Sequence, residues 1–400
     1  MSRAETPKLI RPMRRLRRIG LVLLVLVAIL VAWEPSRVAI QTAVLLPNLL
    51  DAGPKPLSLF SDAPQRMSLP YRASEPGEDP DLAELWLPSW ASAERPAGAM
   101  LLVFGVNNLG RNHPVIARVA DALARTGVAV LVPDSRTLIE GRLEVGEIDG
   151  VVRAFQVLAA RPEVDRTRVG IVGFSVGGSL ALLAAGDPRI ASQVRWVNAF
   201  GAFADASTYL SAVSAHAYRA TDGSTVAWTP TQLAREVFLR FMLDQVEDEN
   251  DRRLLEAAVG EQILAAERPS PDATVRSSFE TDAARSVHDL LTAPSLDEAE
   301  GAIDALPADA LRFIDAISPA RHLADIRAEV HLMHETEDHH VPFVESRALA
   351  SALESTGQLT AHTEFRLFDH VQPDDLDLVA AAPELVKLLF HLRTLIEETL

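Results

Sequence analysis

The sequence predicts a doubly wound, mostly parallel α/β sheet with a large helical cap insertion and an N-terminal membrane helix. Three observations lead to this fold class. From residue 83 onward, apolar runs alternate with helical patterns, as they do in βαβ units. The central runs are rich in valine, isoleucine and leucine, which is typical of strands buried on both faces. One of them ends in a Gly-x-Ser-x-Gly turn that leads directly into a helical pattern.

The alternation is regular enough to place the individual elements. The expected strands are 83–88, 99–106, 128–134, 168–174, 194–202, 329–334 and 364–368, and the expected helices are 115–125, 147–160, 178–185 and 377–398. Ligands of such sheets bind at the carboxyl ends of the strands. We therefore expect the functional residues just after these strands.

Residues 204–317 interrupt the alternation. The pattern there is helical and in places strongly acidic, and 231–243 has the apolar spacing of an amphipathic helix. We interpret this block as a cap over the active site, with a structural appendage or a partner-binding module as the alternative. The α/β core then comprises 67–203 and 318–400.

The N-terminus has the pattern of a membrane-targeting segment. Residues 1–18 hold seven basic residues and one acidic residue, and 19–33 is an apolar run without charge. An uncleaved anchor is the favoured interpretation, because no clear Ala-x-Ala cleavage site follows; a cleaved signal peptide is the alternative. The positive-inside rule then places the body on the outer, periplasmic side of the inner membrane, or free in the periplasm after cleavage. Residues 34–66 are expected to be a proline-rich tether, and the prolines that recur over 47–80 should prevent long helices there.

Composition excludes several classes of function. The net charge is -17 although residues 1–18 carry +6, so the rest of the chain carries about -23 and lacks the basic surface that nucleic-acid binding needs. There is no cysteine, which excludes disulfides, cysteine-ligated zinc and a thiol nucleophile. Arginine dominates the basic residues and alanine is abundant, which is typical of a GC-rich bacterial genome.

The Gly-x-Ser-x-Gly turn supplies a candidate nucleophile. In Gly173-Phe-Ser-Val-Gly177, the glycines allow close backbone packing around a strained turn that exposes the hydroxyl of Ser175 above the sheet. The amide of Val176 is then free at a helix N-terminus, where negative charge is favoured. A second amide for an oxyanion hole should come from the turn after the strand at 99–106, from Val106 or, as the weaker choice, Asn107.

A serine nucleophile also needs a base and an orienting carboxylate, in the chain order Ser, acid, His. Asp338 follows the apolar strand at 329–334 and precedes Val341-Pro342, so it is the favoured acid; Glu335 and Glu337 are its rivals. His370 follows the last expected strand and is the favoured base.

These residues resemble the α/β-hydrolase superfamily, especially its dienelactone-hydrolase-like and acyl-transferase-like esterase branch. The resemblance covers roughly 67–395 and rests on the Ser175 turn, on Asp338 with Val341-Pro342, and on His370. The segment 318–327, which leads into a strand, is also similar to that branch. Two positions depart from the pattern: Phe104-Gly105 and His334-Glu335 stand where the family has His-Gly.

The stretch from His331 to His340 also permits a metal interpretation, because it holds four histidines and several carboxylates. Strand spacing points His331 and His334 to opposite faces, and the adjacent His339 and His340 diverge as well. We therefore expect no metal and no cofactor.

The expected function is that of a serine hydrolase that cleaves an ester-type, small-molecule acyl substrate through a covalent acyl-enzyme. A peptidase or a thioesterase uses the same triad, so both remain alternatives. A non-catalytic hydrolase-like binding protein and a membrane-tethered scaffold using the acidic 204–317 block are alternatives of other classes. The sequence does not indicate an oligomeric state.

Overall fold

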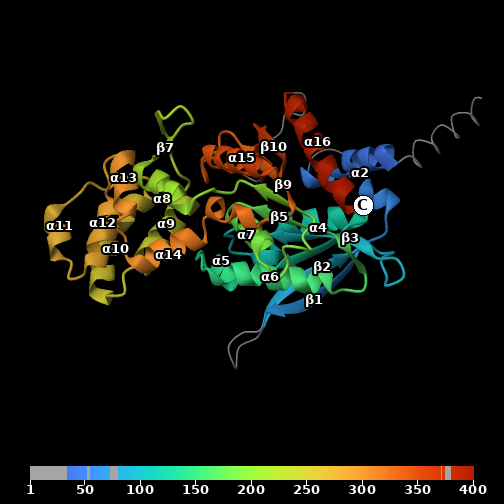
Figure 1. The fold of residues 1–400 in the computed structure, drawn as a ribbon, viewed down its shortest axis with the longest axis horizontal. Coiled ribbons are helices and arrows are strands. Elements are labelled where there is room, and N and C mark those ends of the chain that lie inside the picture. The colour runs from blue at the N-terminus through green and yellow to red at the C-terminus, as the bar shows by residue number, and fades with distance from the viewer. Residues whose placement is uncertain (1–33, 52–54, 73–79, 371, 374–379) are drawn as a thin grey trace, which may run out of the picture.

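A computed structural model describes residues 34–51, 55–72, 80–370, 372–373 and 380–400. Its centre is an eight-stranded sheet with the order β1-β2-β4-β3-β5-β6-β9-β10 (Figure 1). The strands are β1 (Gln65–Arg72), β2 (Asp81–Leu87), β3 (Ala97–Val103), β4 (Ala129–Pro133), β5 (Val164–Phe174), β6 (Trp196–Phe200), β9 (Glu329–Glu335) and β10 (Leu359–Phe365). β2 runs antiparallel to both of its neighbours, and every pairing from β4 to β10 is parallel. The expected mostly parallel α/β sheet is confirmed.

Helices cover both faces of the sheet, and alternate residues of each strand serve different faces. On one face, α6 (Gly146–Ala159), α7 (Val176–Gly186) and α15 (Val344–Thr356) pack on strand residues such as Leu101 and Ile171. On the other face, α2 (Glu34–Leu49), α4 (Pro114–Thr126) and α16 (Ala382–Thr399) pack on Met100, Leu102 and Val172. The short helices α3 (Leu57–Phe60) and α5 (Arg136–Ile139) add Leu57 and Leu138 to the edges of these layers.

Two edge strands differ from the sequence prediction. β1 was not expected, because its proline and its polar residues give it no continuous apolar run; it pairs only with β2 at the edge of the sheet. β10 lies before most of the predicted 364–368 segment. Its residues alternate between polar and apolar and are mostly half-buried, as suits the opposite edge. Phe368–Asp369 instead forms the short strand β11, which pairs with β12 (Gln372–Pro373).

The prediction of an irregular tether over 34–66 is wrong at its start. Glu34–Leu49 is the helix α2, and its residues Val38 and Leu45 are buried against the core. No proline lies between Pro35 and Pro47, and a single proline near the end of a helix removes little hydrogen bonding. α2 lies beside α16, so the N-terminal and C-terminal helices of the described chain pack together (Figure 1).

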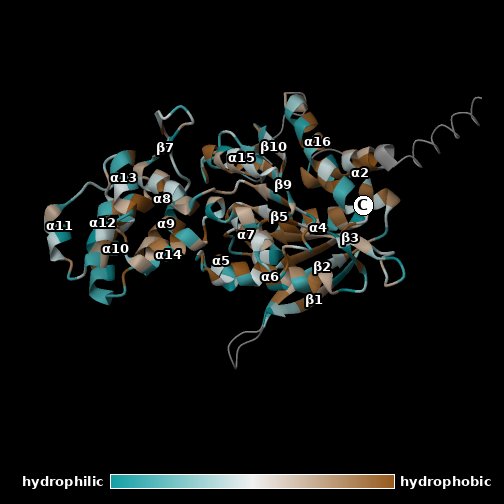
Figure 2. Cartoon of the chain, in the orientation of Figure 1, coloured by the Kyte–Doolittle hydropathy of each residue, from teal (hydrophilic) through white to brown (hydrophobic). Residues whose placement is uncertain are grey.

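Residues 204–317 form a helical unit with a hydrophobic cluster of its own, as the sequence indicated. Its helices are α8 (Ala206–Ala215), α9 (Gln232–Asp244), α10 (Glu249–Leu264), α11 (Ala273–Ser278), α12 (Asp282–Leu291), α13 (Leu296–Ile303) and α14 (Ala308–Ala316). A small hairpin of β7 (Ala217–Arg219) and β8 (Thr225–Ala227), which the sequence did not indicate, projects from it. In Figure 2 the apolar sides of these helices face one another, and their outer sides are largely hydrophilic.

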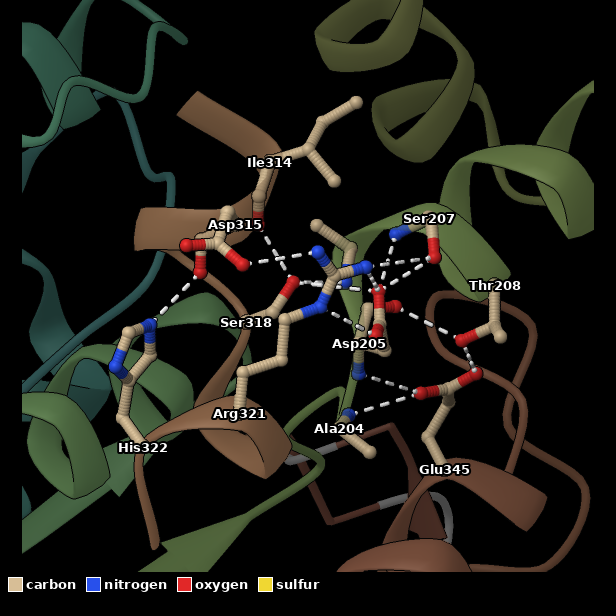
Figure 3. A network of polar contacts seen from close by, with 11 residues as sticks. Ala204, Asp205, Ser207, Thr208, Ile314, Asp315, Ser318, Arg321, His322 and Glu345 are labelled. Atoms are coloured by element: carbon tan, nitrogen blue, oxygen red, sulfur yellow. Dashed lines mark hydrogen bonds and ion pairs between the residues drawn. The ribbon is translucent and has the colours of Figure 1, made fainter. Parts of the chain in front are cut away.

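A network of polar contacts ties both ends of this insertion to the core (Figure 3). Asp205, the N-cap of α8, accepts hydrogen bonds from Arg321 at 2.9 and 3.1 Å. Ser318 donates to Asp205 and to the carbonyl of Ile314 at the end of α14. Glu345 of α15 accepts from the amides of Ala204 and Asp205 at 2.8 and 3.2 Å. The entry and exit of the insertion are therefore fixed at one junction.

The membrane prediction falls largely outside the described residues. The basic segment 1–18 and the apolar run 19–33 are not among them. Within the part of the chain that the structure describes, no helix combines the length and hydrophobicity needed to cross a bilayer.

Candidate active site

Ser175 occupies a strained turn between β5 and α7. Its φ of 57° and ψ of -136° lie in a region that side-chain-bearing residues rarely adopt. The turn is held by hydrogen bonds from the Ser175 amide to Phe200 O and from the Gly178 amide to Ser175 O, both 2.7 Å long. A Cβ on Gly173 would collide with the carbonyl of Gly177, which explains the first glycine of the motif.

The hydroxyl of Ser175 is not used for local structure. At the starts of α8 and α9, the N-cap residues Asp205 and Thr231 accept backbone amides with their side chains, but Ser175 makes no such bond at the start of α7. Its side chain lines a cavity instead. The strain is thus associated with a half-buried hydroxyl group that faces a cavity.

Two backbone segments lie close to Ser175, the start of α7 and the loop after β3. Val176 is the first residue of α7, and an amide at that position has no carbonyl partner within its own helix. The loop after β3 comes close enough that a Cβ on Gly105 would lie 3.0 Å from the Cβ of Ser175. Val106 follows Gly105 and lines the same cavity. Asn107 caps this loop, since its side chain donates to Gly105 O and accepts from the Leu109 amide.

His370 and Asp338 form a buried pair. Nδ1 of His370 lies 2.5 Å from Oδ2 of Asp338, and both residues are almost fully buried. The other carboxylate oxygen of Asp338 accepts the amides of His340 and Val341 at 2.6 and 3.0 Å. Burial alone would raise the pKa of the Asp338 carboxyl, but His370 and His334 beside it lower that pKa below its ordinary value. The carboxylate is therefore ionised and holds the imidazole by Nδ1.

The two rival acids have other positions. Glu335 is buried at the end of β9, where its carboxylate accepts the amides of Leu367 and Phe368 at 2.7 and 2.9 Å. Glu335 thus shapes the segment that leads to His370, and among the described residues it makes no hydrogen bond to the imidazole. Glu337 is exposed. Of the three carboxylates, Asp338 is the one paired with His370.

The second nitrogen of His370 is buried and has no hydrogen-bond partner among the described residues. Ser175 and His370 line one cavity, but their side chains are not hydrogen-bonded to each other in this structure. Such nucleophile–base contacts are often long before substrate binds. His340 stacks on His370 with ring centroids 4.5 Å apart.

The insertion contacts the acid loop directly, which the sequence did not indicate. The indole Nε1 of Trp228 donates to Asp338 O at 2.8 Å, and Oγ1 of Thr231 lies 3.0 Å from Nδ1 of His340. The Thr231 amide also donates to His339 O. Residues 228–231 therefore brace the loop that carries Asp338. Loop contacts of this kind leave no periodic signal in a sequence.

Two hollows meet at Ser175. The larger, of about 290 Å³, extends between the sheet and the helices α2, α4 and α16. The smaller, of about 90 Å³, lies between Ser175 and the insertion helices α9 and α14. The hollows share Val106, Ser175, Leu233 and His340.

Of the remaining histidines of the acid region, His334 also approaches Asp338, with Nε2 3.3 Å from Oδ2, whereas His331 and His339 have other surroundings. His334 is buried with Nε2 3.0 Å from Val341 O, and exposed His339 bonds to the carbonyl of Thr229. His331 is buried on β9, and neither of its ring nitrogens has a partner among the described residues. In the described parts of the chain, no group of three or more potential ligands is placed to hold a metal ion.

No protein-family model and no curated protein sequence matches this chain. Many solved structures are similar to it. A putative dipeptidyl aminopeptidase IV from Bacteroides ovatus has a TM-score of 0.50 and 12% identity, and the match covers 84% of this chain and 36% of that one. An acylaminoacyl peptidase from Pyrococcus horikoshii has a TM-score of 0.45 and 11% identity over 76% of this chain and 37% of that one. The 2,6-dihydroxy-pseudo-oxynicotine hydrolase has a TM-score of 0.44 and 13% identity over 84% and 68%.

The chain spans little more than a third of the length of the first two of these proteins. At such low identity the likeness concerns the fold, which agrees with the strand order β1-β2-β4-β3-β5-β6-β9-β10 and with a nucleophile turn after β5. The chain therefore has the α/β-hydrolase fold.

Proposed function

We propose that this protein is a serine hydrolase that cleaves an ester-type bond through a covalent acyl-enzyme. One observation carries the proposal: Ser175, in a strained turn, lines a cavity that His370 also lines, and Nε2 of His370 is buried without a hydrogen-bond partner among the described residues. A serine hydroxyl is a weak nucleophile unless an adjacent base takes its proton. His370, held at its other nitrogen by Asp338, is placed to be that base.

In the proposed first step, Nε2 of His370 removes the Ser175 proton as Oγ attacks the acyl carbon. The imidazolium is stabilised by ionised Asp338, and the amides of Val106 and Val176 donate to the oxyanion. The tetrahedral intermediate collapses, and the leaving group takes the proton from Nε2. Water, activated by the same nitrogen, then releases the acid and restores Ser175.

The linings of the two hollows favour an uncharged ester over a charged peptide terminus. Among the residues that the structure describes, no aspartate, glutamate, lysine or arginine lines either hollow beside Ser175. Recognition of a charged terminus requires a paired charge or several polar donors in such a site. A peptidase remains the second candidate, because the structural relatives named above include peptidases.

Labelling by a fluorophosphonate tests the nucleophile. We expect one label per chain, mapped to the peptide that contains Ser175 and absent from Ser175→Ala. Turnover of matched ester, thioester and peptide substrates then separates the ester proposal from its alternatives. An unlabelled native protein, or a label on another serine, would contradict the mechanism.

We also propose that residues 19–33 anchor the protein in a membrane, with the catalytic domain on the outer side. The apolar run and its basic flank support this address. Large apolar side chains are exposed on α2, α3 and α16, which contact one another in the order α3, α2, α16: Ile40, Leu59, Phe60, Val386 and Phe390. Membrane fractionation of the full chain and of a chain that begins at residue 34 tests it. Recovery of the full chain in the soluble fraction would contradict an anchor.

A further inference from the structure

We infer that the larger hollow is a channel for one unbranched aliphatic chain of about a dozen carbons, attached to the group that reacts at Ser175. This inference names a substrate class for the site and so rests on the proposed function. We call the hollow the chain channel. It is defined by a floor on the sheet (Met100, Leu102, Val172) and a roof on the helices (Val119, Leu123, Leu392, Ile396).

The channel runs along the strands rather than across them. α4 follows β3 and returns antiparallel to it, since β3 and β4 are parallel. Ile116, Val119 and Leu123 of α4 all line the channel, three or four residues apart on one face of the helix. Leu388, Leu392 and Ile396 do the same on α16. Two helices thus form continuous apolar walls from the level of Ser175 downward.

The register of the sheet gives the depth. Met100, at the deep end, pairs with Gly170 of β5, and Ser175 lies five residues further along. At about 3.3 Å per strand residue, the two levels are about 16 Å apart. With carbon–carbon bonds of about 1.5 Å, an extended alkyl chain advances about 1.3 Å per carbon, so about twelve carbons reach the deep end.

The polar groups of the channel lie at one end. Asn107, Ser175, His340 and His370 line the end where Ser175 reacts, and His113 lines the channel at the start of α4. The exception is Asn198 of β6, which lies among apolar residues. Its side-chain oxygen lies 2.8 Å from Nε2 of buried His391, and its amide nitrogen contacts Met333 Sδ at 3.6 Å. The polar atoms of the Asn198 side chain therefore have partners within the protein, and a ligand need not supply a polar atom there.

The size of the channel selects a slender group. Its volume of about 290 Å³ is at the lower end of the range of about 300–1,000 Å³ for small-molecule sites. A depth of about 16 Å leaves room for one chain in cross-section, not for a branched or polycyclic group. The smaller hollow on the insertion side of Ser175 accommodates the other half of the ester.

Binding to a catalytically dead protein tests the channel independently of the triad. Sodium dodecanoate is titrated into Ser175→Ala by calorimetry, with sodium butanoate as the short comparison. We expect saturable binding of dodecanoate and an affinity for butanoate at least about tenfold weaker, because each added methylene buries apolar surface.

A matched pair of bulky substitutions locates the bound chain. Val119 lines the channel on α4, whereas Val157 is a half-buried valine of α6 on the opposite face of the sheet. In the Ser175→Ala background, Val119→Trp should weaken dodecanoate binding by more than about tenfold, and Val157→Trp should leave it within about twofold. Equal affinities in the two variants would overturn the channel.

The dependence of hydrolysis on chain length gives a second test, in which a substitution enlarges the channel instead of filling it. This test also applies if Val119→Trp does not fold. With Ser175 intact, hydrolysis of p-nitrophenyl esters should rise up to about twelve carbons; Leu123→Ala should move that optimum to longer chains. A parallel series of n-alkyl acetates shows whether the chain belongs to the acyl or the alcohol half. If both ester series are hydrolysed at rates that do not depend on chain length, the channel is overturned but the proposed function stands. If dodecanoate binds but no ester is hydrolysed, the proposed function is contradicted and the channel stands.

Discussion

Two clusters of hydrogen-bonded carboxylates, one at the site and one at the junction of the insertion, are built from similar parts. At the junction, Asp205 and Glu345 accept hydrogen bonds from backbone amides, hydroxyls and Arg321 (Figure 3). At the site, Asp338 likewise accepts two amides and a histidine. The clusters differ in their last member. Arg321 points its donors at carboxylates, whereas His370 leaves Nε2 unpaired beside Ser175.

The charges of the two clusters follow from this difference. Burial raises the pKa of Glu345, which has no cation in its hydrogen bonds. Burial also acts on Asp205, but Arg321 and Ser207 lower its pKa overall. These groups are mutually satisfied and have no capacity left for a ligand. An unsatisfied buried nitrogen costs free energy, and it is retained at the site where a cavity brings a reactant to it.

The largest expected effect breaks the site and leaves the junction intact. Ser175→Ala should lower kcat/KM by a factor on the order of 10⁵, because the covalent step is lost. Its circular dichroism spectrum and melting temperature should be unchanged. The backbone strain at φ 57° is the same with alanine, and the serine side chain makes no capping hydrogen bond that could be lost. Esterase assays with active-site titration measure the loss.

Ser179→Ala is the matched control for that substitution. Ser179 lies one turn further along α7, and its hydroxyl exchanges hydrogen bonds with backbone atoms of Phe203. This variant should lose about 1 kcal/mol of stability and keep most of its activity. Comparable activity losses in the two variants would contradict a nucleophilic role for Ser175.

Asp338→Asn should have the next largest effect. An amide cannot fix the tautomer of His370 or stabilise its imidazolium, and related triads then lose activity by a factor on the order of 10⁴. Glu335→Gln is the informative partner because Glu335 was the rival acid, and its carboxylate accepts the Leu367 and Phe368 amides. We expect Glu335→Gln to affect thermal stability more than kcat. The opposite ranking of the two variants in kcat would exchange their roles.

The buried imidazole of His331, which lies outside both clusters, extends the comparison to the pH dependence of stability. Neither nitrogen of His331 has a partner among the described residues, and His331 does not line the larger hollow. Burial lowers the pKa of His331 to about 4 and that of His391 to about 3. Between about pH 6.5 and 4 the unfolded chain binds more protons than the folded one, so stability falls as pH falls.

For His331 alone this loss amounts to at most about 3 kcal/mol at pH 4. Urea unfolding at pH 7 and at pH 4.5 measures it. His331→Leu should reduce the pH dependence of unfolding while esterase activity at pH 7 is kept. Loss of esterase activity at pH 7 in His331→Leu would mean that His331 contributes to function although it does not line the larger hollow.

Much of the fold and the centre of the site were predictable because they depend on local patterns. Buried parallel strands need apolar runs, and the turn at Ser175 needs its glycines, so both leave a sequence signal. The pairing of Asp338 with His370 followed from their places after late strands. The edge strand β1 and helix α2 were missed, because partners far away in the sequence stabilise them.

The contact of residues 228–231 with the acid loop and the chain channel also left no local pattern in the sequence. Trp228 reaches the backbone of Asp338 across 110 residues of sequence. The channel walls combine helices from both ends of the described chain, whose apolar residues look like ordinary core positions in the sequence. Only the arrangement in space distinguishes a filled core from one that leaves room for a ligand.

The smallest expected effect concerns the junction itself. Asp205→Asn removes the charge that pairs with Arg321, and the amide cannot accept both guanidinium bonds and the Ser207 amide equally well. We expect a loss of about 2 kcal/mol in unfolding free energy, typical of a hydrogen-bonded charge pair. Activity at 25 °C should stay within about threefold, because residues 228–231 still brace the acid loop. A far larger loss of activity without a loss of stability would mean that the junction moves during turnover, and the two clusters would then belong to one functional unit.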